Sequence, residues 1–599
     1  MGPEINFLDR PSTNEVPSEN EFPQIRLLRQ ECRAGIDAID KKIKGLIRQR
    51  KLLEEDLERY DSLLSPVKWV PDDVLSTIFE ISTITWHQQI DNLASTQSER
   101  IRQNPPTIIA SQICKRWRQL ALATPKLWAT IYLVPPSHPR MNTWPYKKQQ
   151  ELDAAERMWE AKMKQLLEII LPLWIERSKQ QPLSVVFRLM DINNGTDNEW
   201  DGDATSVATS SLLYTALVNL ACTVAHRWKE IDLDLYIHNI PAVVTGMLVL
   251  APGDVPRLET ISLQTNDLRQ QNPSFAPQGL FMGQSLRSLS LIRIYGPWAQ
   301  LSVNWEALKE LSVGVKGAVM GVAGSVGSSI ERVLGPCETL LLLRMCPNLE
   351  HCEISVTSID KENTDWQAAK RSEEEHGKSV RHSRLRSLRF HGSLPSVDLL
   401  SCLDLPSLQA LHFLGLHLDN LRPEHRRVQS QRLLNAINRF GSQLTDLRFN
   451  LLVPFESSDA VVSCFQNLPH LFSLHLGGTA PKPRSFRNTE LEVAESTANF
   501  LLNLLTPEID DEGRPYGSMS CPNLKRFVST PMIKGFTEGQ LLEFITRRSL
   551  SPTTSHIARI EQVDVALGVP RGMDIRSELK LRGVDVDRLM LRIQYVKRT

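Results

Sequence analysis

The stretch LETISLQTNDL, residues 258–268, decides how most of this chain folds. Leu258, Ile261 and Leu263 stand at its first, fourth and sixth positions, and Ile261 and Leu263 alternate as residues do on the buried face of a strand. The same phrase, an apolar residue, two others, an apolar, one other and an apolar, recurs along the chain. We therefore predict a row of short strands that share one core. The copies are residues 228–233, 258–263, 286–291, 308–313, 349–354, 385–390, 408–413, 444–449, 471–476 and 560–565, with a weaker copy at 524–529.

The segments between these phrases return the chain across the other side of the core, often as helices. The first residues of successive phrases are 22 to 53 positions apart. Regular leucine-rich repeats are roughly 20–29 residues long, so the longer intervals contain insertions. The predicted fold class is α/β, with an irregular leucine-rich-repeat solenoid (a horseshoe) over residues 134–599. Return segments are residues 242–251, 396–405 and 432–441, and the insertions predicted as flexible loops are 357–383 and 477–520.

The composition is that of an ordinary globular protein. Hydrophobic residues make up 41% of the 599 positions and charged residues 23%, which leaves enough apolar material for a large core and excludes global disorder. Lys and Arg together number 69, as do Asp and Glu, so the chain lacks the basic excess of a dedicated nucleic-acid binder. We expect no nucleic-acid partner.

Cysteines and apolar runs indicate an intracellular protein. The nine cysteines form no CxxC pair and have no regular spacing, as expected of reduced thiols rather than of a disulfide framework. The start, MGPEINFLDR, shows no signal peptide, and the longest apolar run, 242–251, is about half of the ~20 residues that a membrane span needs. We therefore expect a protein of the cytoplasm, the nucleus or both, without a membrane partner.

The N-terminal region divides into a polar tail and a helix. Residues 1–23 are rich in proline and acidic residues and are predicted to be a disordered tail. Over residues 24–64, apolar residues recur at three- and four-residue steps, which predicts a long amphipathic helix with coiled-coil character that ends at Ser65-Pro66. Arg50 is the one break in that row, and the pattern leaves open whether the helix dimerises or folds back. The row is Ile36, Ile39, Ile43, Leu46, Leu53, Leu57, Tyr60 and Leu64.

A basic segment lies within this helix. KKIKGLIRQRK, residues 41–51, holds six basic residues and no acid, as an import signal or a nucleic-acid contact does. The acidic stretch 54–61 that follows favours the other interpretation, a solvated helix face.

Residues 65–133 are predicted to form a small all-α block that ends in a strand. Pro71, Asp72 and Asp73 mark a helix start, because proline fits the first turn and carboxylates there interact favourably with the helix dipole. The apolar stripe that follows is broad enough to face two different surfaces. It consists of Val74, Leu75, Ile78, Phe79 and Ile81.

A second helix is predicted after a polar insertion at residues 85–106. Pro125 ends it, and LWATIYLV, residues 127–134, alternates like a strand. The apolar residues that share one face of this helix are Ile109, Ile113, Trp117, Leu120 and Ala121.

The order of these motifs resembles the F-box, and more narrowly the F-box-like family in which a leading amphipathic helix ends in Ser-Pro, as at Ser65-Pro66. The family pattern is Leu-Pro, an acidic residue, Ile-Leu and Ile-Phe, then Cys-x-x-Trp-x-x-x-Ala and Pro-x-Leu-Trp. The resemblance covers about residues 24–134, and the repeats behind it suit the same family. The chain departs at Trp69, often basic, at Val70, usually Leu, and in the length of its insertion. The matching residues are Val70, Pro71, Val74, Leu75, Ile78, Phe79, Cys114, Trp117, Ala121, Pro125, Leu127 and Trp128.

The resemblance implies a substrate-receptor subunit of an SCF-type cullin–RING ubiquitin ligase. The block would dock on a Skp-type adaptor carried by a cullin scaffold, and the repeats would hold a protein substrate through residues that the pattern does not identify. A block of this size cannot hide all its apolar side chains, so a partner should cover the remaining patch. The implied adaptor-binding residues are Pro71, Val74, Leu75, Ile78, Phe79, Ile113 and Trp117.

Two other interpretations stay open. In the first, the chain is a leucine-rich-repeat scaffold that keeps an F-box-like fold but recruits no ligase. Independently of this, Phe79, Trp117 and Trp128 could join the block to the repeats instead of facing a partner. In the second, the glycine-rich segment 314–335 binds phosphate in an enzyme. That segment lacks a Lys-Ser/Thr pair after its glycines, which favours a repeat loop.

The chain carries no recognisable catalytic or metal-binding motif. It contains no HExxH, GxSxG, GxxxxGK[ST] or EF-hand loop. Its histidines and cysteines never cluster at metal-ligand spacing, and Cys346 and Cys352 fall on or beside one predicted strand, as core cysteines do. We therefore expect no catalytic residues, no metal, no cofactor and a non-enzymatic function.

Overall fold

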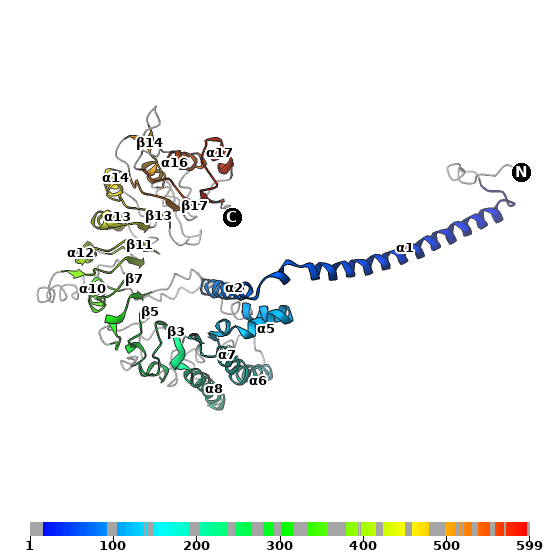
Figure 1. The fold of residues 1–599 in the computed structure, drawn as a ribbon, viewed down its shortest axis with the longest axis horizontal. Coiled ribbons are helices and arrows are strands. Elements are labelled where there is room, and N and C mark those ends of the chain that lie inside the picture. Colours follow the sequence, from blue (N-terminus) through cyan, green and yellow to red (C-terminus); the bar gives the residue numbers. More distant parts are fainter. Residues whose placement is uncertain are drawn as a thin grey trace. The chain divides into compact units, whose positions relative to one another are not determined.

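The protein is a mixed α/β chain with one long N-terminal helix and one large parallel sheet, as a computed structural model shows (Figure 1). The chain divides into two compact units, Met1–Ile81 and Ser82–Thr599, and the boundary lies within helix α2 (Asp72–Asn92). The structure describes residues 16–92, 105–136, 139, 149–190, 204–236, 246–265, 279–292, 301–314, 334–356, 379–392, 394–395, 397–414, 423–449, 458–477, 498–509, 515–516, 520–529, 537–550, 557–567 and 571–595.

The first unit contains α1 (Phe22–Leu64), a helix of 43 residues that extends roughly 64 Å at 1.5 Å per residue. It begins two residues before the predicted start and ends at the predicted Ser65, followed by a 3-10 turn at Pro66–Trp69. Most of the predicted tail, residues 1–15, lies outside the described residues.

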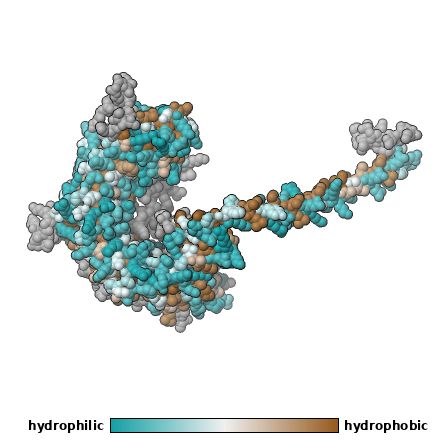
Figure 2. All heavy atoms as spheres, in the orientation of Figure 1, coloured by the Kyte–Doolittle hydropathy of each residue, from teal (hydrophilic) through white to brown (hydrophobic). Residues whose placement is uncertain are grey.

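The apolar row of α1 is exposed along its length. Ile39 and Leu57, for example, each keep 59% of their surface accessible, and Figure 2 shows hydrophobic residues spread along this helix. Arg50, which interrupts the row, pairs with Glu54 one turn later at 2.8 Å. Ion pairs of this spacing support an exposed helix by a few tenths of a kcal/mol, about 0.2–0.5 each.

The second unit is built on a sheet of 14 strands that follow one another in chain order. Every neighbouring pair in this sheet is parallel. In order, the strands are β1 (Thr130–Leu133), β2 (Leu183–Met190), β3 (Trp228–Tyr236), β4 (Thr260–Thr265), β5 (Ser288–Ile292), β6 (Glu310–Val313), β7 (His351–Val356), β9 (Ser387–Gly392), β11 (Ala410–Leu414), β12 (Asp446–Phe449), β13 (Ser473–Leu476), β16 (Arg526–Ser529), β17 (Gln562–Leu567) and β18 (Met590–Tyr595).

Every copy of the phrase, the weak one at 524–529 included, forms one of these strands. Asn266, which completes the longest copy, lies outside the described residues. Two strands of the sheet, β2 and β18, were not predicted. In β2 a single residue separates Leu183 from Val185 and Val185 from Phe187, all three of which are buried. The repeated phrase instead begins with two residues between its first two apolar positions, so β2 does not match it.

Helices and turns carry the chain from each strand to the next. In Figure 1, helices α10, α12, α13 and α14 lie on one side of the row of strands. The predicted return segments 396–405 and 432–441 contain α12 and the end of α13, and the described part of 242–251 contains one helical turn. Two pairs of short strands, β8 (Val380–Arg381) with β10 (Leu403–Asp404) and β14 (Glu508–Ile509) with β15 (Pro515–Tyr516), lie outside the large sheet. Among the residues that the structure describes, the helices of this unit include α4 (Pro106–Ile113), α5 (Lys115–Ala123), α6 (Gln149–Gln165), α7 (Leu171–Arg177), α8 (Ala204–Cys222), α10 (Pro336–Met345), α12 (Val397–Ser401), α13 (Pro423–Phe440), α14 (Ser458–Gln466), α16 (Glu538–Leu550) and α17 (Ile575–Leu581).

The core is one continuous cluster along the helix-facing side of the sheet. The parallel register aligns the fourth and sixth residues of each phrase, so that Ile261 pairs with Leu289 and Leu263 with Leu291. These side chains are at most 1% exposed. Burying such a side chain stabilises the fold by about 1.5–3 kcal/mol, which explains why the phrase tolerates almost any residue except at its apolar positions.

Trp128 joins the helical block to the sheet domain. It is fully buried, its indole Nε1 donates to the carbonyl of Ala121 at 2.8 Å, and its ring meets Trp174 of α7 edge to face at 4.9 Å. The next element, β1, pairs with β2. The contacts of Trp128 agree with the interpretation in which this residue joins the two parts.

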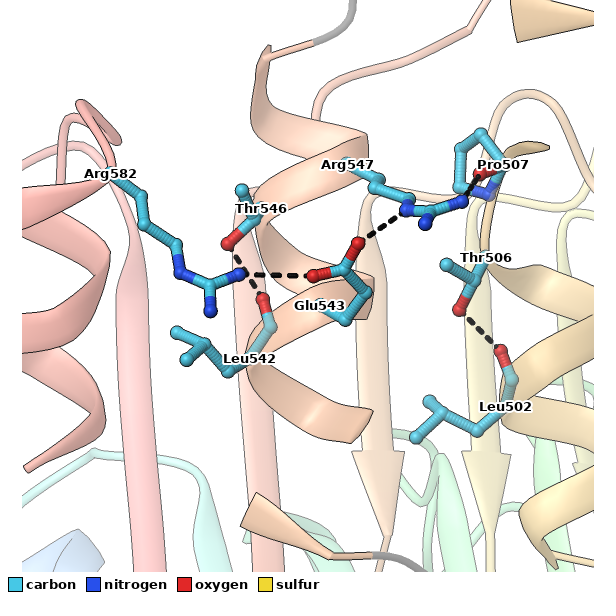
Figure 3. Close-up of polar contacts among 8 residues, drawn as sticks. All are labelled: Leu502, Thr506, Pro507, Leu542, Glu543, Thr546, Arg547 and Arg582. Atoms are coloured by element: carbon cyan, nitrogen blue, oxygen red, sulfur yellow. Dashed lines mark hydrogen bonds and ion pairs between the residues drawn. The ribbon is translucent and has the colours of Figure 1, made fainter. Parts of the chain in front are cut away.

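Helix α16 is tied to its neighbours on both sides. Glu543 lies between Arg547 on its own helix and Arg582, whose Nη1 donates to it at 3.0 Å (Figure 3). Arg547 also donates to the carbonyl of Pro507 at 3.1 Å. The hydrogen bond from Arg547, together with the charge of Arg582, holds the pKa of Glu543 below its usual value.

Arg548 is fully buried and donates only to backbone carbonyls in the described part of the chain. Its three nitrogens reach the carbonyls of Leu505 at 2.8 Å, Cys521 at 3.2 Å, Ser520 at 3.3 Å and Leu524 at 3.4 Å. Burial lowers the pKa of Arg548 to about 10, so it stays charged at neutral pH. One side chain thus connects α16 to two earlier segments.

Several predicted features fall wholly or partly outside the described residues. These are most of the insertions 357–383 and 477–520, most of the glycine-rich segment 314–335 and residues 93–104 of the insertion 85–106, whose first residues continue α2. The described residues 498–505 of the second insertion form a helix that buries Leu501 and Leu505, so the prediction of a flexible loop is wrong for this part. Among the described helices, none combines the length and the apolar character that crossing a membrane requires.

We predict that Arg548→Met lowers the free energy of unfolding by about 3 kcal/mol, because buried carbonyls lose their charged donor. Arg547→Met is the matched control. Its side chain is 36% exposed, so we expect a loss of about 1 kcal/mol or less. Urea denaturation of the full chain measures both, and equal losses would contradict the role given to Arg548.

We predict that Gly45→Ala stabilises α1 by about 1 kcal/mol, because alanine has the higher helix propensity and a Cβ at this position meets nothing within 4 Å. Hydrogen exchange of the amides near residue 45 should slow about fivefold in the full chain. Ala38→Gly, on the same exposed helix, should accelerate exchange by a similar factor. Unchanged exchange in both variants would mean that this segment is not the helix described.

Candidate functional site

The start of α2 follows the local rules that the sequence indicates. Pro71 is exposed and precedes the helix, while Asp72 and Asp73 occupy its first turn. The hydroxyl of Thr77 donates to the carbonyl of Asp73 at 2.9 Å. The helix therefore begins where the predicted adaptor-binding residues begin.

The apolar stripe of α2 splits into a buried and an exposed face. Leu75 is 1% exposed and Phe79 is 4% exposed, whereas Val74 and Ile78 keep 44% and 45%. Residues four positions apart share a face of a helix, and adjacent residues are rotated by about 100°, so the two pairs point in different directions. Leu75 and Phe79 therefore differ from the expectation that both contribute to an adaptor surface.

Further apolar residues of the first unit, near Val74 and Ile78, are also exposed. Ile81 lies one turn after Ile78 and is 58% exposed. We call Val74, Ile78 and Ile81 the α2 face. Trp69 and Val67, in the preceding turn, are 77% and 47% exposed. Contiguous exposed apolar residues of this size are typical of protein-binding surfaces.

The second unit places Ile113 and Trp117 on two short helices. Ile113, at the end of α4, is 56% exposed, and Trp117, in α5, is partly buried. Cys114 between them caps α5, because its sulfur accepts from the backbone N–H of Trp117 at 3.4 Å. Arg118 Nε donates to the carbonyl of Ser111 at 2.7 Å, which fixes the turn between the helices.

A second candidate surface is the side of the sheet opposite the core. The fifth residue of each phrase points to this side, since it lies between two buried residues of a strand. The parallel register aligns these fifth residues in one line, which we call the polar row. Over eight successive strands it consists of Ser262, Ser290, Ser312, Glu353, Arg389, His412, Arg448 and His475.

The middle of the polar row, from Ser290 to Arg389, lines a shallow cavity of about 340 Å³. The cavity exists because the serine side chains that line it are small, and Glu310 and Glu353 add negative charge to its wall. Glu353 Oε1 contacts His391 Nε2 at 2.7 Å. We call this cavity the serine pocket. Its lining includes Ser288, Ser290, Ser312, Ser387, Glu310, His351, Glu353 and Arg389.

The second half of the polar row is basic. Arg389, His412, Arg448 and His475 pair in register across four neighbouring strands. On the next strand, Arg526 pairs with Ser473, which lies two residues before His475. We call the three arginines and the two histidines the cationic cluster. Neighbouring strands are ~4.8 Å apart, so the charges lie close together.

One carboxylate lies within the cationic cluster. His412 Nε2 is 3.2 Å from Asp446 Oδ2. Burial opposes the ionisation of Asp446, but the close contact with His412, the hydroxyl of Ser473 and the charge of Arg526 outweigh it and hold its pKa below the usual value. Asp446 is therefore ionised at neutral pH and offsets part of the positive charge.

The cationic groups raise the electrostatic energy of one another. Burial and the nearby charge of Arg389 lower the pKa of Arg448 from its ordinary value. Burial, with the charge of Arg448, lowers the pKa of His475 to about 4, so this imidazole is neutral at pH 7. An anion at this place would relieve the repulsion.

This surface was not predicted from the sequence, although the residues that form it follow a regular pattern there. The fifth letters of successive phrases read Ser, Ser, Ser, Glu, Arg, His, Arg, His, but they become a surface only when the strands are paired in register. Arg526 could not be found in this way, since it is the third letter of the weakest phrase.

The described residues offer little reactive chemistry. No group of three His, Cys, Asp or Glu side chains among them could hold a metal ion. Cys346 and Cys352 are buried, and burial raises the pKa of Cys346 to about 12. A thiol that stays protonated is a poor nucleophile, which agrees with the prediction that these are core cysteines.

We predict that Leu75→Asp destabilises the chain by about 3 kcal/mol or more, because it buries a carboxylate at a position that is 1% exposed. Val74→Asp, at the neighbouring exposed position, should change stability by about 0.5 kcal/mol or less. Thermal melts of the two variants test the split of the stripe. Equal melting temperatures would contradict it.

Comparison with known proteins does not place the chain in a family. No protein-family model matches it, and no curated protein shows a significant match to its sequence. What the chain does is therefore inferred from the α2 face and from the polar row of the sheet.

Proposed function

We propose that this protein is a substrate-receptor subunit of an SCF-type cullin–RING ubiquitin ligase, in which the α2 face docks on a Skp-type adaptor. The observation that carries the proposal is the exposure of Val74, Ile78 and Ile81 directly after Pro71, within the segment that resembles an F-box. The protein itself would be non-catalytic and would need no cofactor.

The α2 face has a physical reason to be covered. Removing apolar surface from water yields about 25 cal/mol per Å², and three branched side chains on one helix face provide a compact patch. Interfaces depend on a few such central residues. Pro71 supports the patch indirectly, because it fixes the backbone that leads into the helix.

The sheet domain supplies the second half of the proposed function. A row of polar and charged side chains on strands that are fixed by their neighbours gives a rigid surface with a defined pattern. Such a surface suits recognition of a protein substrate, in an irregular leucine-rich-repeat solenoid with the polar row on its binding side. We propose cullin and the Skp-type adaptor as partners, in the cytoplasm, the nucleus or both.

One observation favours the alternative of a scaffold that recruits no ligase. Leu75 and Phe79, two of the residues that the resemblance assigns to the adaptor surface, are buried and leave a smaller apolar face. A scaffold would use the polar row but would have no use for the α2 face. The two functions therefore differ in what binds to α2.

We expect Val74→Asp and Ile78→Asp each to reduce recovery of the Skp-type adaptor and cullin about tenfold or more in a tagged pull-down. A carboxylate in the centre of an apolar contact loses its hydration without gaining a partner, which costs about 2 kcal/mol or more. Both positions are exposed, so the variants should melt like the wild type.

The matched control is Leu581→Asp, which places the same charge on an apolar residue of α17 that is 80% exposed. It should keep the wild-type recovery of adaptor and cullin. Capture of adaptor by both α2 variants, or by none of the proteins including the wild type, would reject the ligase and favour the scaffold.

A further inference from the structure

The apolar row of α1 is regular and uncovered along the helix. Its side chains keep from 46% of their surface accessible, at Ile43, to 71%, at Leu64 (Figure 2). Helices in proteins owe most of their stability to the packing of such a face and little to intrinsic propensity. A helix of 43 residues with an exposed apolar row therefore needs something to pack against.

The row repeats every seven residues, as the seam of a coiled coil does. Isoleucine at heptad position a with leucine at position d, as at Ile43 and Leu46, is typical of two-stranded coiled coils. The same frame places Arg29 and Arg50 at a positions. The apolar a positions are Ile36, Ile43, Leu57 and Leu64, and the d positions are Ile25, Cys32, Ile39, Leu46, Leu53 and Tyr60.

We propose that α1 forms an antiparallel coiled coil with α1 of a second copy of this chain, in the register that places Ile43 beside Leu46 of the other copy. In this arrangement each a residue faces a d residue of the other copy. The two helices then overlap over almost their full length, and a twofold axis repeats every contact. The seam is thereby covered from Ile25 to Leu64.

The distribution of charge along α1 favours this arrangement. The helix has no acidic residue in its first turn and no basic residue in its last, which is the reverse of what the helix dipole favours. In the antiparallel register, Arg26 faces Asp61 of the other copy, and both are e positions. Arg33 faces Glu54 of the other copy in the same way. Opposite charges at such flanking positions determine which helices pair and in which orientation.

A parallel dimer in register would bring like charges together. Position a then faces position a of the other copy, so Arg29 would lie beside Arg29 and Arg50 beside Arg50. Asp56, at position g, would face Asp61 of the other copy at position e. Each of these contacts is repulsive, and those of the arginines lie within the seam, where the solvent screens them least.

The antiparallel register instead gives each seam arginine a suitable neighbour. Arg50 lies beside Ile39 of the other copy, which Asp40 follows directly. Arg29 lies beside Tyr60 of the other copy, whose ring can accept a guanidinium group on its face. A polar residue at an a position specifies the register of a coiled coil. The break at Arg50 thus becomes a reason for this register.

The mass of the full-length chain tests the dimer. Sedimentation equilibrium at micromolar concentration should give twice 67.9 kDa. Leu46→Asp buries an unpaired carboxylate from each copy and should raise the dissociation constant at least about a hundredfold. The matched control is Leu52→Asp, at a position outside the seam that is 62% exposed, which should change the constant less than about threefold.

Two results of this experiment would overturn the proposal. One is a wild type that sediments as a monomer at these concentrations. If that monomer binds vesicles that contain phosphatidylserine, the apolar row belongs on a membrane surface instead. The other is a dimer that Leu46→Asp and Leu52→Asp leave equally stable.

Reversing charges tests the orientation. Arg26→Asp and Asp61→Arg should each weaken the dimer about fivefold, because like charges then face each other twice in every dimer. The helix dipole favours both changes, so a weaker helix would not explain the loss. The double variant should return to within about twofold of the wild type. In a parallel dimer Asp61→Arg would face Asp56 and tighten the contact, which would contradict the antiparallel arrangement.

A disulfide reports the register. Cys32 is an exposed free thiol, and the proposed register places it opposite Leu57 of the other copy. Oxidation of Leu57→Cys should join the introduced thiol to Cys32 of the other copy, as peptide mapping would show. Leu52→Cys, outside the seam, should form no such link. A Cys32–Cys32 link in the wild type would indicate parallel helices and overturn the register.

This inference goes beyond the proposed function and does not depend on it. Val74→Asp lies outside α1 and should leave the dimer intact, whatever happens to adaptor recovery. Conversely, Leu46→Asp leaves the α2 face unchanged and should recover as much adaptor per chain as the wild type does. The two proposals can therefore fail separately.

Discussion

The backbone hydrogen bonds between neighbouring parallel strands are the interaction on which the rest of this structure depends. Apart from one irregularity between Leu183 and Ser184, they hold the strands from β1 to β18 in register, so that a residue such as Leu411 lies beside Leu388 and Leu447. A shift of one residue in any strand would move its apolar side chains to the solvent and its charged ones into the core. The core, the polar row and the side that the helices cover all follow from this single alignment.

The row of strands could be predicted from the sequence because its signal is local, whereas part of the candidate site could not be predicted because its signal is not local. Alternation within six residues predicts a strand, and the repeated phrase predicts that the strands stack. The spacing of apolar residues in α2 does not show whether Leu75 or Val74 is buried, because the residues on both faces of the stripe are apolar. Packing against the rest of the chain decides which face is buried. Likewise, Arg448 and His475 are 27 residues apart in the sequence, and they become neighbours only because their two strands pair in the sheet.

The two candidate surfaces differ in their hydration. The α2 face is apolar and poorly hydrated, which favours a lasting contact that stays formed over a range of salt concentrations. The polar row is hydrated when it is empty, and its charges are screened by ions, so association there is reversible and sensitive to ionic strength. A protein with one surface of each kind is suited to holding one partner durably while exchanging another.

The order of the strands in the sheet also has a consequence for how the chain is made. Synthesis proceeds from the N-terminus, and each strand of the sheet pairs with the one made just before it. A strand that leaves the ribosome therefore meets an edge that is already complete, and no strand has to wait for a partner that has not yet been translated. The sheet can grow at the pace of translation, one strand at a time, and each new strand covers the edge that the previous strand left exposed.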